Sequence, residues 1–190
     1  MDKQELQVIL QTLENVLANG VVGDVAEFGC YIGTTALFVQ RLLRQKAIDK
    51  QLHVYDSFAG LPAKTNEDLS PAGQQFKAGE LTVSKAEFIK QFRQAAVPLP
   101  VVHKGWFADL TLADVPAALC FAFLDGDFYD SIQQSLRLVW PRLVPGAIVV
   151  VDDYQSLALP GARRAVDEWL RLHPGQLRVE ASLAVIRPLI

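Results

Sequence analysis

Apolar residues in the N-terminal part of the chain recur first at helical and then at strand spacing. Over residues 3–18 they return every three or four positions, as in an amphipathic helix, and Asn19-Gly20 supplies a stop. The run from Gly23 to Gly29 is apolar enough for a buried strand that ends at glycine, and residues 34–45 resume the helical period. The pattern predicts a helix, a strand, a glycine-containing loop and a second helix.

The rest of the chain alternates short apolar runs with longer segments of helical period. This alternation predicts a parallel sheet covered by helices on both faces, and the last two strands are joined closely enough to pair antiparallel. Strands are expected at Leu52–Asp56, Pro100–His103, Cys120–Asp125, Ile148–Asp152, Leu177–Ala181 and Leu183–Pro188, and helices at 84–96, 128–143 and 162–172.

The segment from residue 57 to residue 83 has no clear period and is long for a connection in a compact domain. Long loops of this kind often cover an active site, and we expect such a cover here. The alternative is an ordered surface loop without a function.

Length and composition narrow the class of protein. The 190 residues, 51% of them hydrophobic, fit one domain of residues 1–190, with a helix within 1–20 and an α/β core over 21–190. The net charge of −3 gives no reason to expect nucleic acid as a partner. No apolar stretch approaches the roughly 20 residues of a membrane span, and the N-terminus lacks a signal-peptide pattern, so we expect a cytoplasmic protein whose Cys30 and Cys120 are reduced and buried.

Glycines follow the first strand in the pattern Glu27-x-Gly29-x-x-x-Gly33. This spacing departs from the G-x-G-x-x-G of dinucleotide enzymes and favours a cationic nucleoside cofactor without a pyrophosphate. Glu27 could hold an amino group of that cofactor or organise the loop. Asp56, which ends the second strand, is placed to accept hydrogen bonds from two ribose hydroxyls. The alternative is that the glycines only make the turn.

Acidic residues end two further strands. Asp125 and Asp127 follow one, Asp152 and Asp153 follow the next, and the carboxyl ends of parallel strands meet at one edge of the sheet. Repelling carboxylates beside a ligand crevice suit a hard cation, so we predict Mg²⁺ or another divalent cation held by Asp125, Asp152 and Asp153. Asp127 could instead cap the following helix.

Several ordered blocks make the chain resemble the macrocin O-methyltransferase (TylF/MycF-like) family. They are Val25–Gly29, Tyr55–Pro62, Gly105–Phe107, Leu124–Ser131 and Val151–Tyr154, followed by Pro160–Asp167. The resemblance implies a Rossmann-like class I methyltransferase with a seven-stranded, mostly parallel sheet and one antiparallel strand. It also implies S-adenosylmethionine and Mg²⁺ as cofactors and a small-molecule hydroxyl acceptor, a sugar or another natural product. Cofactor contacts are expected at Glu27, Gly29, Tyr31, Gly33, Thr34, Asp56, Ser57, Gly105, Trp106, Phe107 and Asp125.

In the expected reaction the metal orients the acceptor hydroxyl and either Asp125 or Asp127 takes its proton. Only 26 residues precede Glu27, fewer than in family members that act on macrolide sugars, so we expect either a more open pocket or one completed by a second subunit. Two alternatives remain: a non-catalytic module or partner subunit that binds S-adenosylmethionine or S-adenosylhomocysteine, and an NAD-dependent oxidoreductase, which the glycine spacing opposes. The N-terminal helix packs either on its own core or on a partner of a homo-oligomer.

Overall fold

The computed structural model describes residues 2–46 and 48–190. Its helices are α1 (Lys3–Ala18), α2 (Thr34–Gln45), α3 (Lys85–Gln94), α4 (Tyr129–Val139) and α5 (Pro160–Leu172), and its strands are β1 (Asp24–Phe28), β2 (Leu52–Asp56), β3 (Val101–Lys104), β4 (Leu119–Leu124), β5 (Leu143–Val151), β6 (Gly175–Glu180) and β7 (Leu183–Pro188). Short 3-10 helices lie at η1 (Asn66–Asp68), η2 (Pro71–Gly73), η3 (Phe107–Asp109), η4 (Leu112–Asp114) and η5 (Trp140–Arg142).

The strands form one seven-stranded sheet in the order β3-β2-β1-β4-β5-β7-β6. All pairs among β1 to β5 are parallel, whereas β7 runs antiparallel to both β5 and β6. The predicted parallel sheet with one antiparallel strand is therefore confirmed. The chain order reverses between β1 and β4, and ligands of open α/β sheets bind at the carboxyl ends of the strands beside such a reversal.

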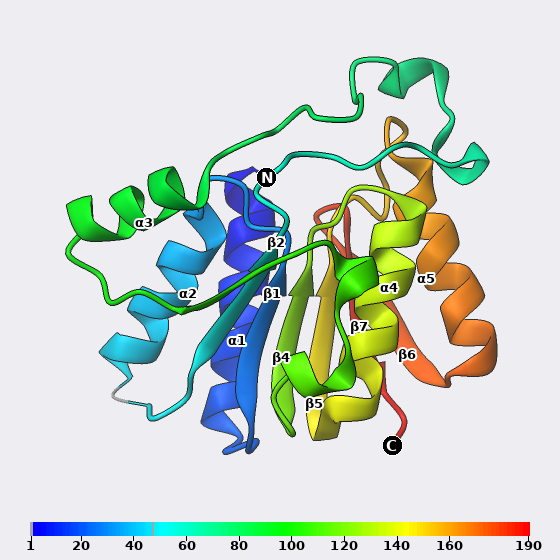
Figure 1. The fold of residues 1–190 in the computed structure, drawn as a ribbon. Coiled ribbons are helices and arrows are strands. Elements are labelled where there is room, and N and C mark those ends of the chain that lie inside the picture. The colour runs from blue at the N-terminus through cyan, green and yellow to red at the C-terminus, as the bar shows by residue number, and fades with distance from the viewer. Residues whose placement is uncertain (1, 47) are drawn as a thin grey trace.

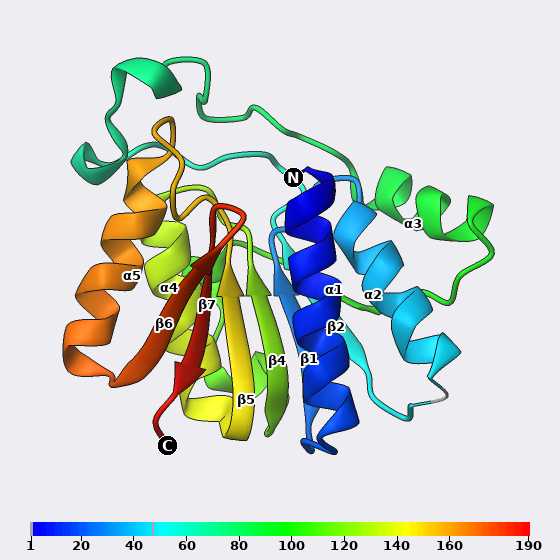
Figure 2. The ribbon, with the colours of Figure 1, turned by 180° about the vertical axis from the view of Figure 1, so that it is seen from behind.

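Strand side chains alternate between two apolar cores because successive residues point to opposite faces of the sheet. In β4, Phe121 and Phe123 pack with α1 and α2 on one face. Ala122 and Leu124 pack with α4 and α5 on the other. Figures 1 and 2 show these helices on the two opposite sides, which confirms the predicted covering of both faces.

Helix α1 packs on the core of its own chain. Ile9 and Leu13 are completely buried in the cluster that also contains residues of β1, β4 and β5. The Asp2 carboxylate caps the first turn by accepting the backbone N–H groups of Gln4 and Glu5. Figure 2 shows α1 lying along the sheet, and the buried side chains of this helix pack in the core of the same chain.

The boundary between α4 and β5 differs from the prediction. The helix ends at Val139 rather than near 143, because Pro141 has no N–H and a 3-10 turn follows. Strand β5 begins at Leu143 rather than at Ile148. Its early residues Pro145 and Gly146 are exposed, so they carry no apolar signal from which a strand could be predicted.

Two smaller expectations can be compared with the structure. Cys30 and Cys120 are free and buried, as predicted. Within residues 2–46 and 48–190, no helix has the length and apolar character needed to cross a membrane.

Candidate functional site

A cavity of about 610 Å³ opens at the carboxyl ends of β1, β2, β4 and β5. Most of the predicted site residues line it, namely Gly29, Tyr31, Asp56, Ser57, Gly105, Trp106, Phe107, Asp125, Asp127, Asp152 and Asp153. Glu27, Gly33 and Thr34 are not part of its lining. The sequence interpretation missed Glu5, Asp130, Ser131 and Gln134, which also face the cavity from α1 and α4.

The two loop glycines are required by the packing of the protein itself. Gly29 has a φ of +86°, and a Cβ there would lie 2.0 Å from the carbonyl oxygen of Asp125. This close approach lets the Asp125 N–H donate to the carbonyl of Phe28 at 2.8 Å, which joins the ends of β1 and β4. A Cβ on Gly33 would lie 2.7 Å from the ring of Phe88. Gly33 therefore has a structural role at the start of α2, and Gly29 alone borders the cavity.

Asp56 organises the loop after β1 from the end of β2. One carboxylate oxygen accepts the backbone N–H groups of Cys30 at 2.8 Å and Tyr31 at 3.3 Å. The other accepts the N–H of Phe58 at 2.7 Å. Oδ1, which accepts only this one bond among the described residues, keeps a further lone-pair direction, so Asp56 can bind this loop and still accept a ligand hydroxyl from the cavity.

Glu27 is buried beneath the same loop, with a residue exposure of 2%. Its Oε2 atom has no hydrogen-bond partner among the described residues. Burial raises the pKa of Glu27 well above its ordinary value, and the charge of Asp56 raises it further, against a hydrogen bond from the Ala36 backbone. A buried acceptor without a donor is rare in folded proteins, which suggests a group that completes this site.

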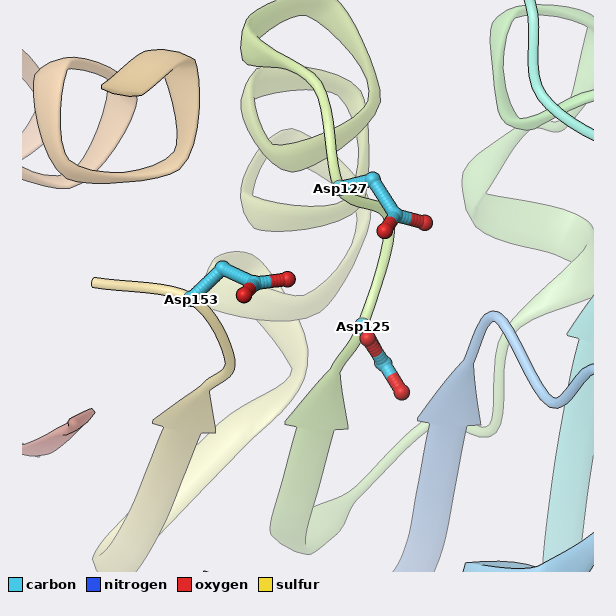
Figure 3. Close-up of side chains that lie close together, drawn as sticks. All are labelled: Asp125, Asp127 and Asp153. Carbon is cyan, nitrogen blue, oxygen red and sulfur yellow. The ribbon is translucent and has the colours of Figure 1, made fainter. Parts of the chain in front are cut away.

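Three carboxylates converge where β4 and β5 end. Asp125, Asp127 and Asp153 each offer an oxygen within 4.8 Å of the other two. Figure 3 shows that they come from the end of β4, from the turn before α4 and from the loop after β5. The predicted set was Asp125, Asp152 and Asp153; Asp125 and Asp153 belong to this group of three, together with Asp127. Asp152 remains adjacent, where its side chain accepts the N–H of Asp153 at 2.9 Å.

Two of the three carboxylates stand on an unusual backbone conformation. Asp127 and Asp153 both have left-handed backbones, with φ values of 61° and 58°. This conformation is unfavourable for residues with a Cβ and is common at functional sites, because surrounding structure must hold it. The alternative role of Asp127 as the cap of α4 is not observed. The N-cap residue is Phe128, and the first N–H of the helix donates to a carboxylate of the segment 57–83.

The pKa values of the acidic residues in and beside this cluster are raised. Burial, followed by repulsion from Asp152, raises the pKa of Asp127 to about 7 and that of Asp153 to about 8. Burial and the same neighbours raise the pKa of Asp125 well above its ordinary value. Burial also raises the pKa of Asp152, against hydrogen bonds from the Asp153 backbone and with the Asp125 side chain. The cluster is thus stabilised by either protons or a cation.

The long segment over residues 57–83 forms part of the cavity wall. It contributes Ser57, Gly60, Leu61, Pro62, Ala63, Phe76 and Leu81. In Figures 1 and 2 this segment passes over the carboxyl ends of the strands and reaches the N-terminal end of α5 before returning to α3. This placement agrees with the prediction of a cover.

Comparison with known proteins gives one consistent family. The macrocin O-methyltransferase (TylF) family model matches residues 1–181. Demethyldecarbamoylnovobiocin O-methyltransferase of Streptomyces niveus is 34% identical over 175 residues, covering 87% of this chain and 65% of the relative. Mycinamicin III 3''-O-methyltransferase of Micromonospora griseorubida is 31% identical over 179 residues, covering 90% of this chain and 69% of the relative. The chain thus spans about two thirds of the length of these curated relatives.

Solved structures agree with the sequence relatives. The structure of the O-methyltransferase NovP superimposes with a TM-score of 0.82 at 28% identity, over 97% of this chain and 79% of that one. The structure of CalS11, a calicheamicin methyltransferase, gives a TM-score of 0.80 at 20% identity, over 96% and 78%, and supports the fold alone. The fold is that of class I methyltransferases, and this chain belongs to the macrocin O-methyltransferase (TylF) family.

Proposed function

We propose that this protein is an S-adenosylmethionine-dependent, divalent-metal-assisted O-methyltransferase that acts on a hydroxyl of a small molecule, a sugar or another natural product. The observation that carries the proposal is one cavity with two distinct halves. The β1–β2 side presents Gly29, backbone groups of the loop and Asp56, which accepts three backbone N–H groups. The β4–β5 side presents three converging carboxylates. Membership in a family of natural-product O-methyltransferases supports the same assignment.

The first half fits an adenosine cofactor with a charged amino acid portion. Asp56 would accept the ribose hydroxyls, and the Gly105–Phe107 turn would form a wall of the adenine pocket, since Trp106 and Phe107 line the cavity. The unpartnered Oε2 of Glu27 lies below the loop, where a hydrogen-bond donor of the cofactor's amino group would satisfy it. Gly29, Tyr31 and Ser57 would contact the cofactor through the cavity wall, whereas Gly33 and Thr34 would act through the shape of the loop.

The second half fits a small, hard cation. Asp125, Asp127 and Asp153 present oxygen atoms alone, as Mg²⁺ prefers, and their separations allow one ion to contact all three. Asp152 would orient Asp125 and Asp153 through its hydrogen bonds rather than bind the ion directly. The raised pKa values of Asp127 and Asp153 mean that an ion must displace protons in order to bind.

When bound, the two cofactors would supply an electrophilic methyl group and a positive charge that lowers the pKa of the acceptor hydroxyl. The chain would hold that hydroxyl in line with the methyl group between the two halves of the cavity. Asp127 would take the hydroxyl proton on a carboxylate oxygen, because the Asp125 carboxyl is already hydrogen-bonded to Asp152. Leu61, Phe76 and Leu81 of the cover would exclude water from the acceptor side.

The proposal is tested by a methyl-transfer assay on a panel of glycosides and phenols. Protein stripped with a chelator and incubated with S-adenosylmethionine should release S-adenosylhomocysteine and add one methyl group to an acceptor only after Mg²⁺ is restored. Turnover that is unaffected by the chelator would remove the metal from the proposal. Tight binding of S-adenosylhomocysteine without turnover on any acceptor would favour a non-catalytic binding module.

A further inference from the structure

Asp68 is a buried carboxylate within the long cover segment. It is completely buried, although it lies in a 3-10 turn of a connecting segment. Its Oδ2 accepts the backbone N–H of Thr65 at 2.9 Å and the Thr65 hydroxyl at 2.8 Å. Its Oδ1 accepts the backbone N–H of Tyr129, the first residue of α4, at 2.7 Å. One side chain therefore joins the cover to the helix that follows Asp127.

The residues around Asp68 leave room for close packing of the cover segment. A Cβ on Gly161, in the first turn of α5, would lie 1.8 Å from Asp68 Oδ1, so only glycine leaves room for the carboxylate. A Cβ on Gly73 would lie 2.0 Å from the carbonyl oxygen of Ala158. The Ser70 hydroxyl donates to the carbonyl of Leu157 at 2.6 Å. The segment 65–73 is thus seated on the N-terminal ends of α4 and α5 and the loop before α5.

This seat lies between the two parts of the cover that line the cavity, residues 60–63 and the pair Phe76 and Leu81. The bond from Tyr129 N–H to Asp68 also satisfies the N-terminus of α4, where a carboxylate is favourable. Asp127 is therefore not needed as a cap and can face Asp125 and Asp153.

We propose that Asp68 is a positioning residue of the active site: it latches the cover onto α4, which holds the acceptor-side wall in place and leaves Asp127 available to the carboxylate cluster. This role rests on the proposed methyl transfer, but the latch itself can be tested without turnover.

The chain contains a matched control for this latch. Thr111 and Asp114 form the same local pair, with the backbone N–H and the hydroxyl of Thr111 both donating to Asp114 Oδ2 at 2.8 Å. Asp114 is exposed and does not line the cavity. Replacing either aspartate by alanine removes the same local bonds, and only Asp68→Ala also removes the bond to α4.

Limited trypsin digestion of the full chain measures the latch directly, through the initial rate of cleavage after Lys64, which lies in the cover and is partly buried. We expect Asp68→Ala to be cleaved at least tenfold faster than Asp114→Ala and the unmodified protein. Asp68→Asn keeps an oxygen for Tyr129 N–H and should give an intermediate rate, at least threefold faster than Asp114→Ala. Circular dichroism checks folding, and Asp68→Asn carries the test if the alanine variant does not fold. Equal cleavage of the folded Asp68 variants and Asp114→Ala would overturn the latch.

A kinetic comparison then tests positioning. Asp68→Ala should raise the KM of the acceptor at least fivefold while the KM of S-adenosylmethionine stays within twofold, and Asp68→Asn should recover part of the loss. Equal changes in both KM values, or none, would contradict positioning of the acceptor side. If the unmodified protein turns over no acceptor, the proposed function fails, whereas the digestion experiment still decides whether the latch exists.

Discussion

The carboxylates in the two halves of the cavity differ in their hydrogen bonding and in their distance from one another. On the β1–β2 side, Asp56 accepts three backbone N–H groups and is fixed by the loop that it organises. On the β4–β5 side, Asp125, Asp127 and Asp153 face one another at short range, and burial with mutual repulsion raises their pKa values. Asp56 is thus satisfied without a ligand, whereas the three carboxylates of the β4–β5 side are not.

This difference indicates which ligand each half accepts. A carboxylate that is already satisfied can bind neutral hydroxyl groups without a large change in charge, as ribose recognition requires. Converging carboxylates that repel one another are relieved most strongly by a divalent cation. We therefore assign cofactor binding to the β1–β2 side and methyl transfer to the β4–β5 side. Mutations on the two sides should affect these two steps separately.

The largest effect should come from removing charge on the β4–β5 side. We expect Asp127→Asn with Asp153→Asn to lower kcat by about 10³-fold or more, because both the metal site and the proposed base are lost. Calorimetric affinity for S-adenosylhomocysteine should stay within about threefold, since Asp56 and its loop are untouched. Asp130→Asn, an acid of the same cavity outside the cluster, is the control and should lose far less activity. A near-normal kcat in the double variant would contradict the assignment of methyl transfer to the β4–β5 side.

The converse change on the β1–β2 side should affect binding. Asp56→Asn replaces an oxygen acceptor by an NH₂ group that opposes the loop N–H donors, and it removes a charged acceptor from the ribose. We expect the Kd of S-adenosylhomocysteine to rise by about 30- to 100-fold, with Mn²⁺ affinity in the absence of cofactor nearly unchanged. Ser57→Ala provides a neighbouring control. Loss of Mn²⁺ binding in Asp56→Asn would show that the two halves are not independent.

Glu27 tests the comparison further because, within the part of the chain that the structure describes, it is the one acid on the cofactor side with an unpartnered buried oxygen. If its Oε2 receives a cationic group of the cofactor, Glu27→Gln should weaken S-adenosylhomocysteine binding by about 5- to 20-fold. Binding of 5′-methylthioadenosine, which lacks the amino acid portion, should be unaffected. Equal weakening of both ligands would assign Glu27 to loop organisation alone.

The last prediction concerns stability rather than activity: the free energy of unfolding of the protein without metal should depend on pH. Asp127 and Asp153 have pKa values raised to about 7 and about 8, so their protonated forms are favoured by folding. Their contribution is fully present below the unfolded value near 4 and is lost as pH rises through the folded values. Between pH 6 and pH 9 the free energy of unfolding should fall by about 2–4 kcal/mol, measured by urea denaturation. Asp153→Asn should make this decline shallower, and an unchanged slope would contradict the assignment.

Much of the fold could be predicted because burial leaves a clear pattern. Strand β4 is buried along its whole length, and α1 has an apolar stripe, so both appear in the sequence. In the first part of β5, Pro145 and Gly146 are exposed and give no such signal. Its start was therefore placed too late.

The site was predicted less completely for a different reason. Acids at strand ends could be placed at one edge of the sheet, but which of them converge depends on left-handed backbones at Asp127 and Asp153. Asp68 could not be found, because its partner Tyr129 is distant in sequence and the Thr65–Asp68 pair looks identical to the exposed Thr111–Asp114 pair. Glu5 was missed because it lies in α1, far in sequence from the strand ends that carry the other cavity acids.

Calorimetric titration of the purified protein with S-adenosylhomocysteine, with NAD⁺ as the control and each with and without Mg²⁺, tests the central claim most directly. We predict saturable 1:1 binding of S-adenosylhomocysteine and none of NAD⁺, with Mg²⁺ required for turnover rather than for this binding. Binding of NAD⁺ in its place, or of neither ligand under any of these conditions, would contradict the account.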